Sequence, residues 1–178
     1  MIKTFSSRAG RLSSTNKYFL NLKSNCLISP ETKVKTNYSI VLDIGFGDAQ
    51  SFKQDVLSNK KFCFIGIEPY KKGFAKAVEF YEMEKPENLF LYNGDAREFL
   101  EAINYEISFI RIHFPDPWPK KKHIKRRLIS KNFLYLLNKK ISETGKIEII
   151  TDSKIYQDHI EDVLHEQKIF KQIESFEI

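Results

Sequence analysis

Acidic residues stand at places in this sequence where they could take part in chemistry, at the ends of short apolar runs. The set comprises Asp43, Glu68, Asp95, Asp116 and Asp152. Gly45 and Gly47 follow the first of these acids, and glycines let a ligand approach the backbone closely. An acid about 20 residues further on, at the end of the next strand, can accept hydrogen bonds from both hydroxyls of a ribose. The pattern therefore predicts a site for a cofactor that carries a nucleotide.

The residues around the glycine turn distinguish between two kinds of cofactor. A dinucleotide fingerprint needs a third glycine where this chain has Gln50. A carboxylate at Asp43 suits a cationic amino-acid group, and Asp95 can accept a hydrogen bond from an adenine amino group. S-adenosylmethionine has both groups, so the set predicts this cofactor. A tight strand-to-helix turn at the glycines and helix N-caps at Asp95 and Asp152 would explain the same residues one by one.

A proline-rich stretch, residues 114–119, joins the apolar run 107–113 to a dense basic run, and we call this stretch the elbow. Its prolines fix φ and stop the preceding strand, so Asp116 and Trp118 are expected on a stiff loop at the carboxyl end of a buried strand. Ligands bind at such strand ends in open α/β sheets. The elbow therefore predicts a positioned functional group.

The basic run that follows holds six lysines and arginines and no acid between residues 120 and 127, as many positive charges as the net charge of +6 of the whole chain. Such a run favours nucleic acid through neutralisation of phosphates and release of counterions. A solvated helix face or a localisation signal would have the same composition. Residues 1–30 also carry basic residues and no acid, and we expect either a second phosphate-contacting arm or a loosely packed tail.

Length and composition limit the class of protein. A chain of 178 residues suits one domain, so we divide it into a basic arm at 1–30 and a single domain at 31–178. No apolar stretch approaches the roughly 20 residues that a membrane span needs. The first residues lack the apolar core of a secretory signal, and Cys26 and Cys63 have no metal-ligand spacing. We expect a cytoplasmic protein without a membrane or metal partner, and leave monomer or homodimer open.

Short apolar runs alternate with amphipathic segments from residue 40 onward. This alternation predicts an α/β fold with right-handed crossovers and a mostly parallel twisted sheet that has helices on both faces. The expected strands are a first one from 40 into the glycine turn, then 62–67, 89–92, 107–113, 146–151 and a last one within 169–178. The expected helices are one from 48 with Phe52, Val56 and Leu57 inward, one near 74–83, a short one after Asp95, and one with Leu128, Leu134, Leu137 and Ile141 that ends at Gly145.

Several motifs together make the chain resemble the bacterial tRNA (guanine-N7-)-methyltransferase family from about residue 5 to 165. They are Arg8-Ala9-Gly10-Arg11-Leu12, Asp43-Ile44-Gly45-Phe46-Gly47, Gly66-Ile67-Glu68, Asp95-Ala96, the signature from Phe114 to His123 with Lys125-Arg126-Arg127-Leu128, and Thr151-Asp152. The resemblance implies a Rossmann-like class I S-adenosylmethionine-dependent methyltransferase with a shortened C-terminal end. Only Phe176-Glu177 matches the family's Thr-x-Phe-Glu motif, and this chain has Asp43 where relatives commonly have Glu.

The resemblance also implies a role for each matching residue. The methyl donor would contact Asp43, Gly45, Gly47, Glu68, Asp95, Ala96 and Asp116. The guanosine would contact Lys120 and Asp152. The RNA would contact Lys122, His123, Lys125, Arg126 and Arg127. The methylated base is cationic, and a nearby carboxylate stabilises charge that develops there. Asp116 or Asp152 could supply this carboxylate, and Asp116 is the catalytic candidate. Trp118 is expected either to stack on a base or to fill an apolar gap under the elbow.

The function implied is transfer of a methyl group from S-adenosylmethionine to N7 of a guanosine in the variable loop of tRNA. Two alternatives stand beside it. One is a degenerate, inactive relative that only binds tRNA. The other is a methyltransferase of the same fold that acts on another nitrogen, although such enzymes usually place an aromatic residue directly after two prolines, whereas Pro117 separates Asp116 from Trp118 here.

Overall fold

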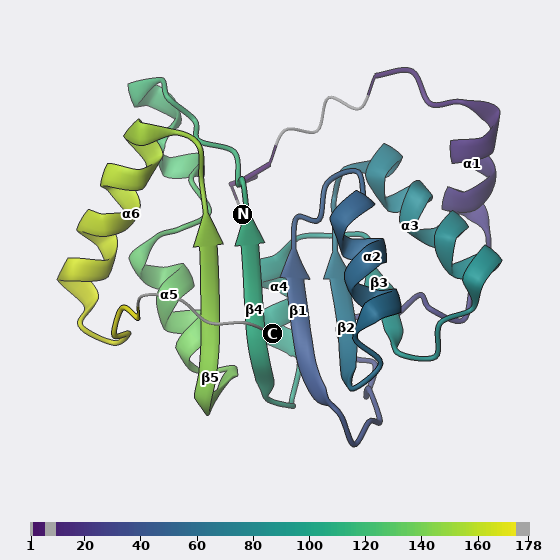
Figure 1. Ribbon diagram of the computed structural model, residues 1–178. Coiled ribbons are helices and arrows are strands. Elements are labelled where there is room, and N and C mark those ends of the chain that lie inside the picture. The colour runs from purple at the N-terminus through teal and green to yellow at the C-terminus, as the bar shows by residue number, and fades with distance from the viewer. Residues whose placement is uncertain (1, 6–9, 174–178) are drawn as a thin grey trace.

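The strands form one parallel sheet in the computed structural model, which describes residues 2–5 and 10–173. Their order across the sheet is β3-β2-β1-β4-β5, and Figure 1 shows their carboxyl ends along one edge. The bounds are β1 Ser39–Ile44, β2 Phe62–Ile67, β3 Leu89–Tyr92, β4 Ile107–His113 and β5 Ile141–Ile150. The order changes direction beside β1, where the chain crosses from β3 to β4, so a cleft is expected between β1 and β4.

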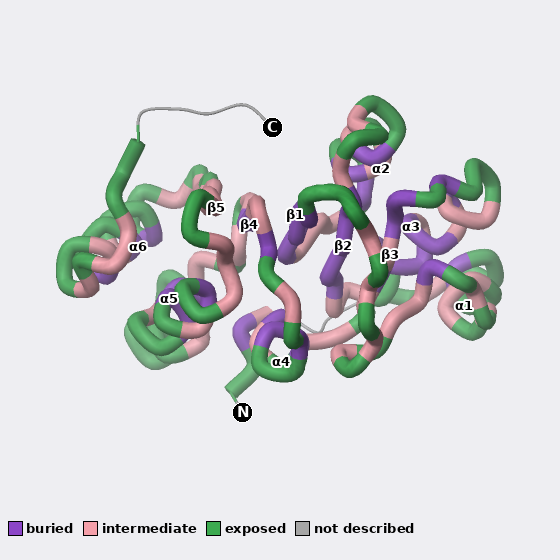
Figure 2. The backbone as a smooth tube through the Cα atoms, turned by 90° about the horizontal axis from the view of Figure 1, so that it is seen from below, coloured by how far each residue is buried: buried purple, intermediate pink, exposed green. Residues whose placement is uncertain are grey.

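Helices cover both faces of this sheet (Figure 2). Their bounds are α1 Ser14–Asn21, α2 Gln50–Ser58, α3 Lys71–Glu84, α4 Ala96–Ala102, α5 Lys131–Asn138 and α6 Lys154–Gln167, with the 3-10 helix η1 at Lys121–Arg126. Apolar residues of α2 and α3 pack on one face, and those of α4, α5 and α6 pack on the other. Successive side chains of a strand point to opposite faces of the sheet. Val41 of β1 therefore packs with α2 and α3, and its neighbour Leu42 packs with α4, α5 and α6.

The predicted α/β fold is confirmed. The predicted strands 62–67, 89–92 and 107–113 have the bounds of β2, β3 and β4. Runs of this kind are read correctly because a central parallel strand is buried on both faces, and β1 and β2 are buried along nearly their whole lengths. Asp95 caps α4 by accepting a hydrogen bond from the Arg97 N–H at 2.9 Å.

Four residues of the predicted helices were placed wrongly. Leu128 precedes α5 and its N-cap Ser130 instead of lying inside that helix. Ile141 is the first residue of β5 rather than the end of a helix, and Gly145 lies inside this strand. The register shifts between Ile107 and Phe109, which pair with Ile141 and Lys146, so the strand holds extra residues in an irregularity that the apolar pattern does not reveal. Leu57 is 43% exposed because the buried stripe of α2 runs through Phe52 and Val56, four residues apart.

Both ends of the chain differ from expectation where they are described. Residues 169–173 form no strand, and residues 174–178 of that predicted strand lie outside the described residues. Near the other end, α1 packs on α3, and Cys26 and Ile28 exchange backbone hydrogen bonds with Leu91 at 2.7 and 3.0 Å. The predicted division into 1–30 and 31–178 stays a prediction, while residues 10–28 follow the surface of the domain. Arg8 and Ala9 of the expected basic turn are not described.

The described residues include neither a membrane-spanning helix nor a metal-binding cluster. None of the helices there is both long enough and apolar enough to span a bilayer. The same part of the chain contains no cluster of three or more histidine, cysteine, aspartate or glutamate side chains able to hold a metal ion.

Candidate active site

A cavity of about 380 Å³ opens at the carboxyl ends of β1, β2 and β4. Its walls come from the segments that follow these strands and β3, together with the first residues of the chain. The lining residues are Thr4, Phe5, Ile44, Gly45, Gly47, Ile67, Glu68, Pro69, Tyr70, Gly94, Ala96, His113, Phe114, Pro115, Asp116 and Leu128. This is the place at which open α/β sheets bind ligands, and the volume suits a small molecule, since such pockets measure about 300–1,000 Å³.

The glycine turn after β1 exposes its backbone to the cavity. Gly45 and Gly47 have φ angles of 80° and 61°, in the left-handed region that glycine adopts without a steric penalty. The Gly45 N–H donates to the Ile67 carbonyl at 2.7 Å, which fixes the turn against β2. Gly73 at the start of α3 completes the arrangement, because a Cβ atom there would lie 1.7 Å from the Gly47 carbonyl oxygen. The sequence carries no signal for Gly73, because the requirement for glycine there depends on this close approach.

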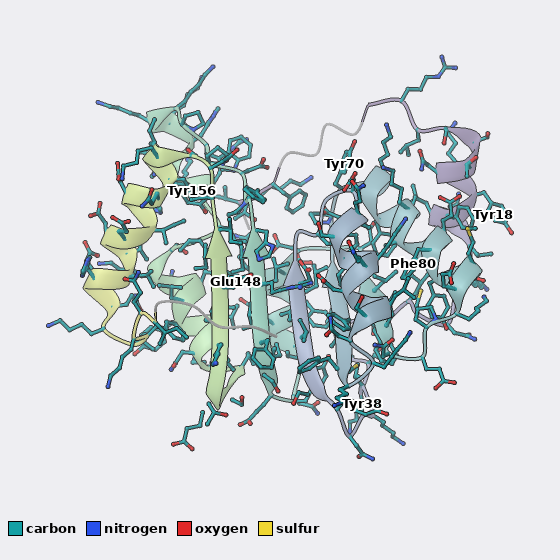
Figure 3. All side chains as sticks on the ribbon, viewed as in Figure 1. Tyr18, Tyr38, Tyr70, Phe80, Glu148 and Tyr156 are labelled. Atoms are coloured by element: carbon teal, nitrogen blue, oxygen red, sulfur yellow. The ribbon has the colours of Figure 1, made fainter. Side chains whose placement is uncertain are left out.

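Glu68 is a buried carboxylate fixed at the end of β2. It is 5% exposed, and its two oxygens accept hydrogen bonds from the Gly47 and Tyr70 N–H groups at 2.6 and 2.7 Å. Figure 3 shows Tyr70 beside the start of α3, at the edge where the strands end. Burial raises the pKa of Glu68 to about 7, even though the two N–H groups favour the ionised form. Each oxygen keeps further acceptor capacity for a ligand in the cavity.

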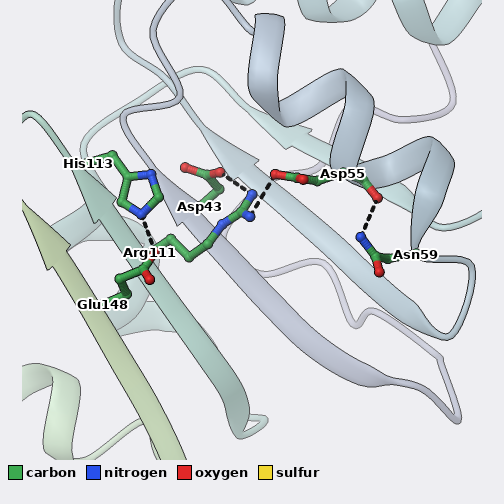
Figure 4. Close-up of polar contacts among 6 residues, drawn as sticks. All are labelled: Asp43, Asp55, Asn59, Arg111, His113 and Glu148. Atoms are coloured by element: carbon green, nitrogen blue, oxygen red, sulfur yellow. Dashed lines mark hydrogen bonds and ion pairs between the residues drawn. The ribbon is translucent and has the colours of Figure 1, made fainter. Parts of the chain in front are cut away.

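Asp43 is occupied by a partner inside the protein. Its carboxylate accepts a hydrogen bond from Arg111 Nη2 at 2.6 Å, and Arg111 Nη1 donates to Asp55 on α2 at 2.7 Å (Figure 4). Burial raises the pKa of the Asp43 carboxyl, while the neighbouring guanidinium works in the opposite direction. Asp43 is not among the residues that line the cavity. Its predicted contact with the methyl donor stays a prediction, and the structure gives it a second role in an internal ion pair.

Asp95 is similarly engaged. Besides the Arg97 backbone N–H, the Arg97 side chain donates to both of its oxygens, from Nε at 2.9 Å and from Nη2 at 2.5 Å. Arg97 also donates from Nη2 to the carbonyl oxygen of Ile2 at 2.7 Å, so it ties the start of the chain to α4. Gly94 and Ala96, on either side of Asp95, line the cavity.

Two residues of the elbow, one near each end, have a left-handed backbone. Phe114 has φ 49° and Trp118 has φ 42°. The Phe114 N–H donates to the Ile150 carbonyl at 2.8 Å, and Arg127 Nε donates to the Pro117 carbonyl at 3.0 Å. Asp116 is exposed and lines the cavity. These bonds hold the loop at both ends, which agrees with the predicted stiffness.

Trp118, within the elbow, contacts other parts of the protein through its side chain. Its Nε1 donates to the Thr4 carbonyl at 2.9 Å, the Arg126 guanidinium lies 4.9 Å from the ring centroid, and the His123 ring meets it edge to face at 5.5 Å. Of the two predicted roles, the structure favours packing over stacking on a base.

The basic run forms η1, and its residues separate by exposure. Lys121, Lys122 and Lys125 are exposed, and none of them forms an ion pair with the described part of the chain. Desolvation and the cations around it lower the pKa of His123. Arg127 is only 7% exposed and stacks 5.4 Å from the centroid of Tyr156. Its RNA contact stays a prediction, and its side chain points into the protein.

The cavity thus brings together some predicted residues and leaves others outside. Five of the predicted donor contacts line it: Gly45, Gly47, Glu68, Ala96 and Asp116. The predicted guanosine contacts Lys120 and Asp152 are exposed and do not line it.

Known proteins resemble this chain over most of its length. A family model described as "Putative methyltransferase" matches residues 37–177. A tRNA (guanine-N(7)-)-methyltransferase of Francisella philomiragia is 31% identical over 97% of this chain and 80% of its own. The chain belongs to the tRNA (guanine-N7-)-methyltransferase family. Relatives of the same name in Wolbachia pipientis and Nitrosococcus oceani are 40% and 38% identical over 74% and 75% of this chain, and the matches span 60% and 57% of their own lengths.

Solved structures place the fold of this family member among methyltransferases. A precorrin-6y C5,15-methyltransferase from Geobacter metallireducens superposes with a TM-score of 0.57 at 10% identity, over 91% of this chain and 74% of its own. An rRNA methylase from Streptococcus thermophilus superposes with a TM-score of 0.53 at 12% identity, over 89% and 78%. The class I methyltransferase fold is therefore confirmed.

Family and fold indicate S-adenosylmethionine as the methyl donor, and the cavity fits it. Glu68 offers a fixed, buried acceptor for ribose hydroxyls, and the glycine turn offers backbone for close approach. Ile44, Ile67 and Leu128 provide apolar wall for an adenine ring. Glu68 and Asp116 are the acids of the lining, and they suit a cationic ligand.

Several residues of the site in this family member were missed by the sequence analysis. Arg111 pairs with Asp43, Arg97 pairs with Asp95, and His113 Nε2 lies 2.5 Å from Glu148 Oε2 on β5. A charged residue in an apolar strand was the available signal for Arg111, because a buried charge needs a partner. Thr4 and Phe5 gave no signal, since their place beside the elbow depends on the tertiary fold.

Proposed function

We propose that this protein transfers a methyl group from S-adenosylmethionine to N7 of a guanosine in the variable loop of tRNA, forming 7-methylguanosine in the cytoplasm. One observation supports this most. Asp116 lines the donor cavity and stands on the same short connection as the exposed lysines of η1, so one rigid loop joins the cavity to a cationic surface. The family and the name of the Francisella philomiragia relative agree with this function.

The reaction makes modest demands on the protein. Guanine N7 already carries an available lone pair, so no general base is needed and alignment of the two reactants is the main requirement. The donor, when bound, supplies an electrophilic methyl group. Glu68 and the glycine turn hold the donor in one orientation, and Asp116 lies where the charge moves onto the base. A carboxylate fixed beside the new cation stabilises the transition state electrostatically.

Binding of the tRNA falls to the outer face of the same loop. Lys121, Lys122 and Lys125 carry cationic side chains into solvent, where they neutralise phosphates without reading bases. Lys120 and Asp152, exposed beyond the cavity, are placed in this proposal beside the guanosine once the tRNA is bound.

The direct test is methylation of a tRNA transcript with isotopically labelled S-adenosylmethionine, followed by mass spectrometry of its nucleosides. We expect labelled 7-methylguanosine, and none from a transcript whose variable-loop guanosine is replaced by adenosine. A label on another nucleoside would favour the alternative methyltransferase. tRNA binding without any label would favour the inactive relative.

Asp116→Asn separates chemistry from binding in the same assay. The amide keeps the size and shape of the side chain and removes its charge, so the single-turnover rate should fall about 10²-fold or more, as when one transition-state electrostatic contact is lost. Filter binding of tRNA should be unchanged, because the phosphate contacts lie on η1. Asp116→Glu, which keeps the charge, controls for reach. A wild-type rate for the Asn variant would leave Asp116 as a loop-shaping residue.

A further inference from the structure

Phe114, the first residue of the elbow, has an unusual combination of backbone and side-chain properties. Its φ of 49° lies in the left-handed region, and the residue is 62% exposed. It nevertheless lines the donor cavity, between His113 and Pro115. Its backbone is fixed, because the Phe114 N–H donates to the Ile150 carbonyl at 2.8 Å.

Folding gives no reason for phenylalanine at this position. A left-handed backbone favours glycine, and to a lesser extent asparagine, because other side chains crowd the carbonyl oxygen. A phenylalanine can offset this penalty by burying its ring, but a residue that is 62% exposed buries little of its surface. Strained residues of this kind collect at functional sites, where the surrounding structure holds them in place.

Trp118 is a useful comparison, because it shares the left-handed backbone. Its indole has partners within the protein: the hydrogen bond to Thr4 and the Arg126 guanidinium near the ring. Trp118 therefore has a structural explanation, whereas residues 2–5 and 10–173 include no aromatic or cation partner for the Phe114 ring.

We propose that Phe114 is the residue on which the target purine stacks, beside Asp116 at the mouth of the donor cavity. This assignment rests on the proposed function. A planar base that leaves its stack in the tRNA needs an apolar face of its own size, and aromatic side chains supply one. The methylated product is a cation, and a cation over an aromatic face is further stabilised. Phe114 thus orients the base, and Asp116 meets its developing charge.

Phe114→Gly tests this, since it removes the ring and also relieves the backbone. We expect kcat/KM for tRNA to fall about tenfold or more, the lower part of the range for one lost base-stacking contact. The melting temperature should stay the same or rise. Affinity for S-adenosylhomocysteine, measured by calorimetry, should fall by a smaller factor than kcat/KM for tRNA, because Glu68 and the glycine turn are unaltered. Phe114→Tyr keeps a ring and should remain near wild type. Tyr135→Ala removes a ring that is 58% exposed on α5, away from the cavity, and should have no effect.

A second readout keeps this inference separate from the proposed function. With S-adenosylhomocysteine bound, guanosine is titrated into wild type and Phe114→Gly, and its ring proton signals are followed by NMR. Broadening or shifts that need Phe114 support the stacking role even if wild type methylates no tRNA, an outcome that would overturn only the proposed function. A fully active Phe114→Gly, a clear drop in its melting temperature, or guanosine signals that do not depend on Phe114 would overturn the stacking role.

Discussion

The two sides of the cavity differ in how far their charged groups are exposed to solvent. On the donor side, acids at the ends of β1, β2 and β3 are bound within the protein: Asp43 by Arg111, Glu68 by two backbone N–H groups, and Asp95 by Arg97. Fixed partners of this kind hold the side chains in one geometry before any ligand arrives.

The side that we propose for tRNA presents its groups to solvent. Phe114 and Asp116 are exposed on the elbow, and Lys121, Lys122 and Lys125 are exposed on η1. The difference follows the size of the proposed ligands. A small donor can be surrounded by a preformed pocket, whereas a large polyanion is met by a surface that reaches out to it. The comparison teaches that charge alone does not define the role of a residue, because burial or exposure in the fold decides whether its charge can meet a large ligand.

Breaking the donor-side network should have the largest effect. Arg111→Ala would leave the buried Asp43 carboxylate without its partner, and removal of one member of a buried pair costs about 3–5 kcal/mol of folding stability. Urea denaturation measures this cost. Lys154→Ala is the matched control, because it breaks an exposed pair with Asp158 and should cost less than about 1 kcal/mol. Equal effects of the two variants would mean that the Arg111 pair behaves as a surface contact.

Glu68 sharpens the comparison through pH. Its pKa is raised from 4.5 to about 7, so the folded protein holds this proton more tightly than the unfolded chain does. Glu68 therefore contributes stability that is fully present below about pH 4.5 and is lost as the pH rises through about 7.

Donor binding should show the opposite trend, if the ionised carboxylate is the form that accepts the ribose hydroxyls. With a pKa of about 7, the ionised fraction falls about tenfold between pH 8 and pH 6, and the affinity for S-adenosylhomocysteine should fall by about the same factor. Calorimetry at several pH values measures this. Glu68→Gln cannot ionise and should bind weakly with a flat pH profile. A flat profile in wild type would show that the protonation state of Glu68 does not control the site.

The sequence predicted the donor side of the fold well, for a physical reason. Strands buried on both faces are short apolar runs, and ligand residues follow their carboxyl ends, so Glu68 and the glycine turn could be placed from order alone. Internal partners could not be predicted in this way. The ion pair of Asp43 with Arg111 depends on the register of β1 and β4, which aligns the two residues across neighbouring strands.

The basic run shows the limit of composition more sharply. Its residues are nearly alike in sequence, but η1 turns Lys121, Lys122 and Lys125 outward while Arg127 turns inward to Pro117 and Tyr156. The turn of a short 3-10 helix after a proline loop decides this. A local pattern of charges contains no apolar stripe that would reveal which cations face the protein.

The smallest expected effect per residue is the loss of tRNA binding when the exposed lysines of the basic run are replaced. Replacing Lys121, Lys122 and Lys125 by Ala should weaken tRNA binding and flatten its salt dependence, since each lost phosphate contact lowers the logarithmic slope by about 0.7 to 0.9. The melting temperature should hardly change, because the side chains are exposed.

Arg127→Ala is the matched control: the same salt slope is expected with a lower melting temperature, because the elbow loses the hydrogen bond to Pro117. Filter binding at several salt concentrations, beside thermal melts, separates the two. If Arg127→Ala changes the slope as much as the lysines do per residue, the inward arginine reaches the RNA, and exposure in the free protein is a poor guide to the tRNA surface.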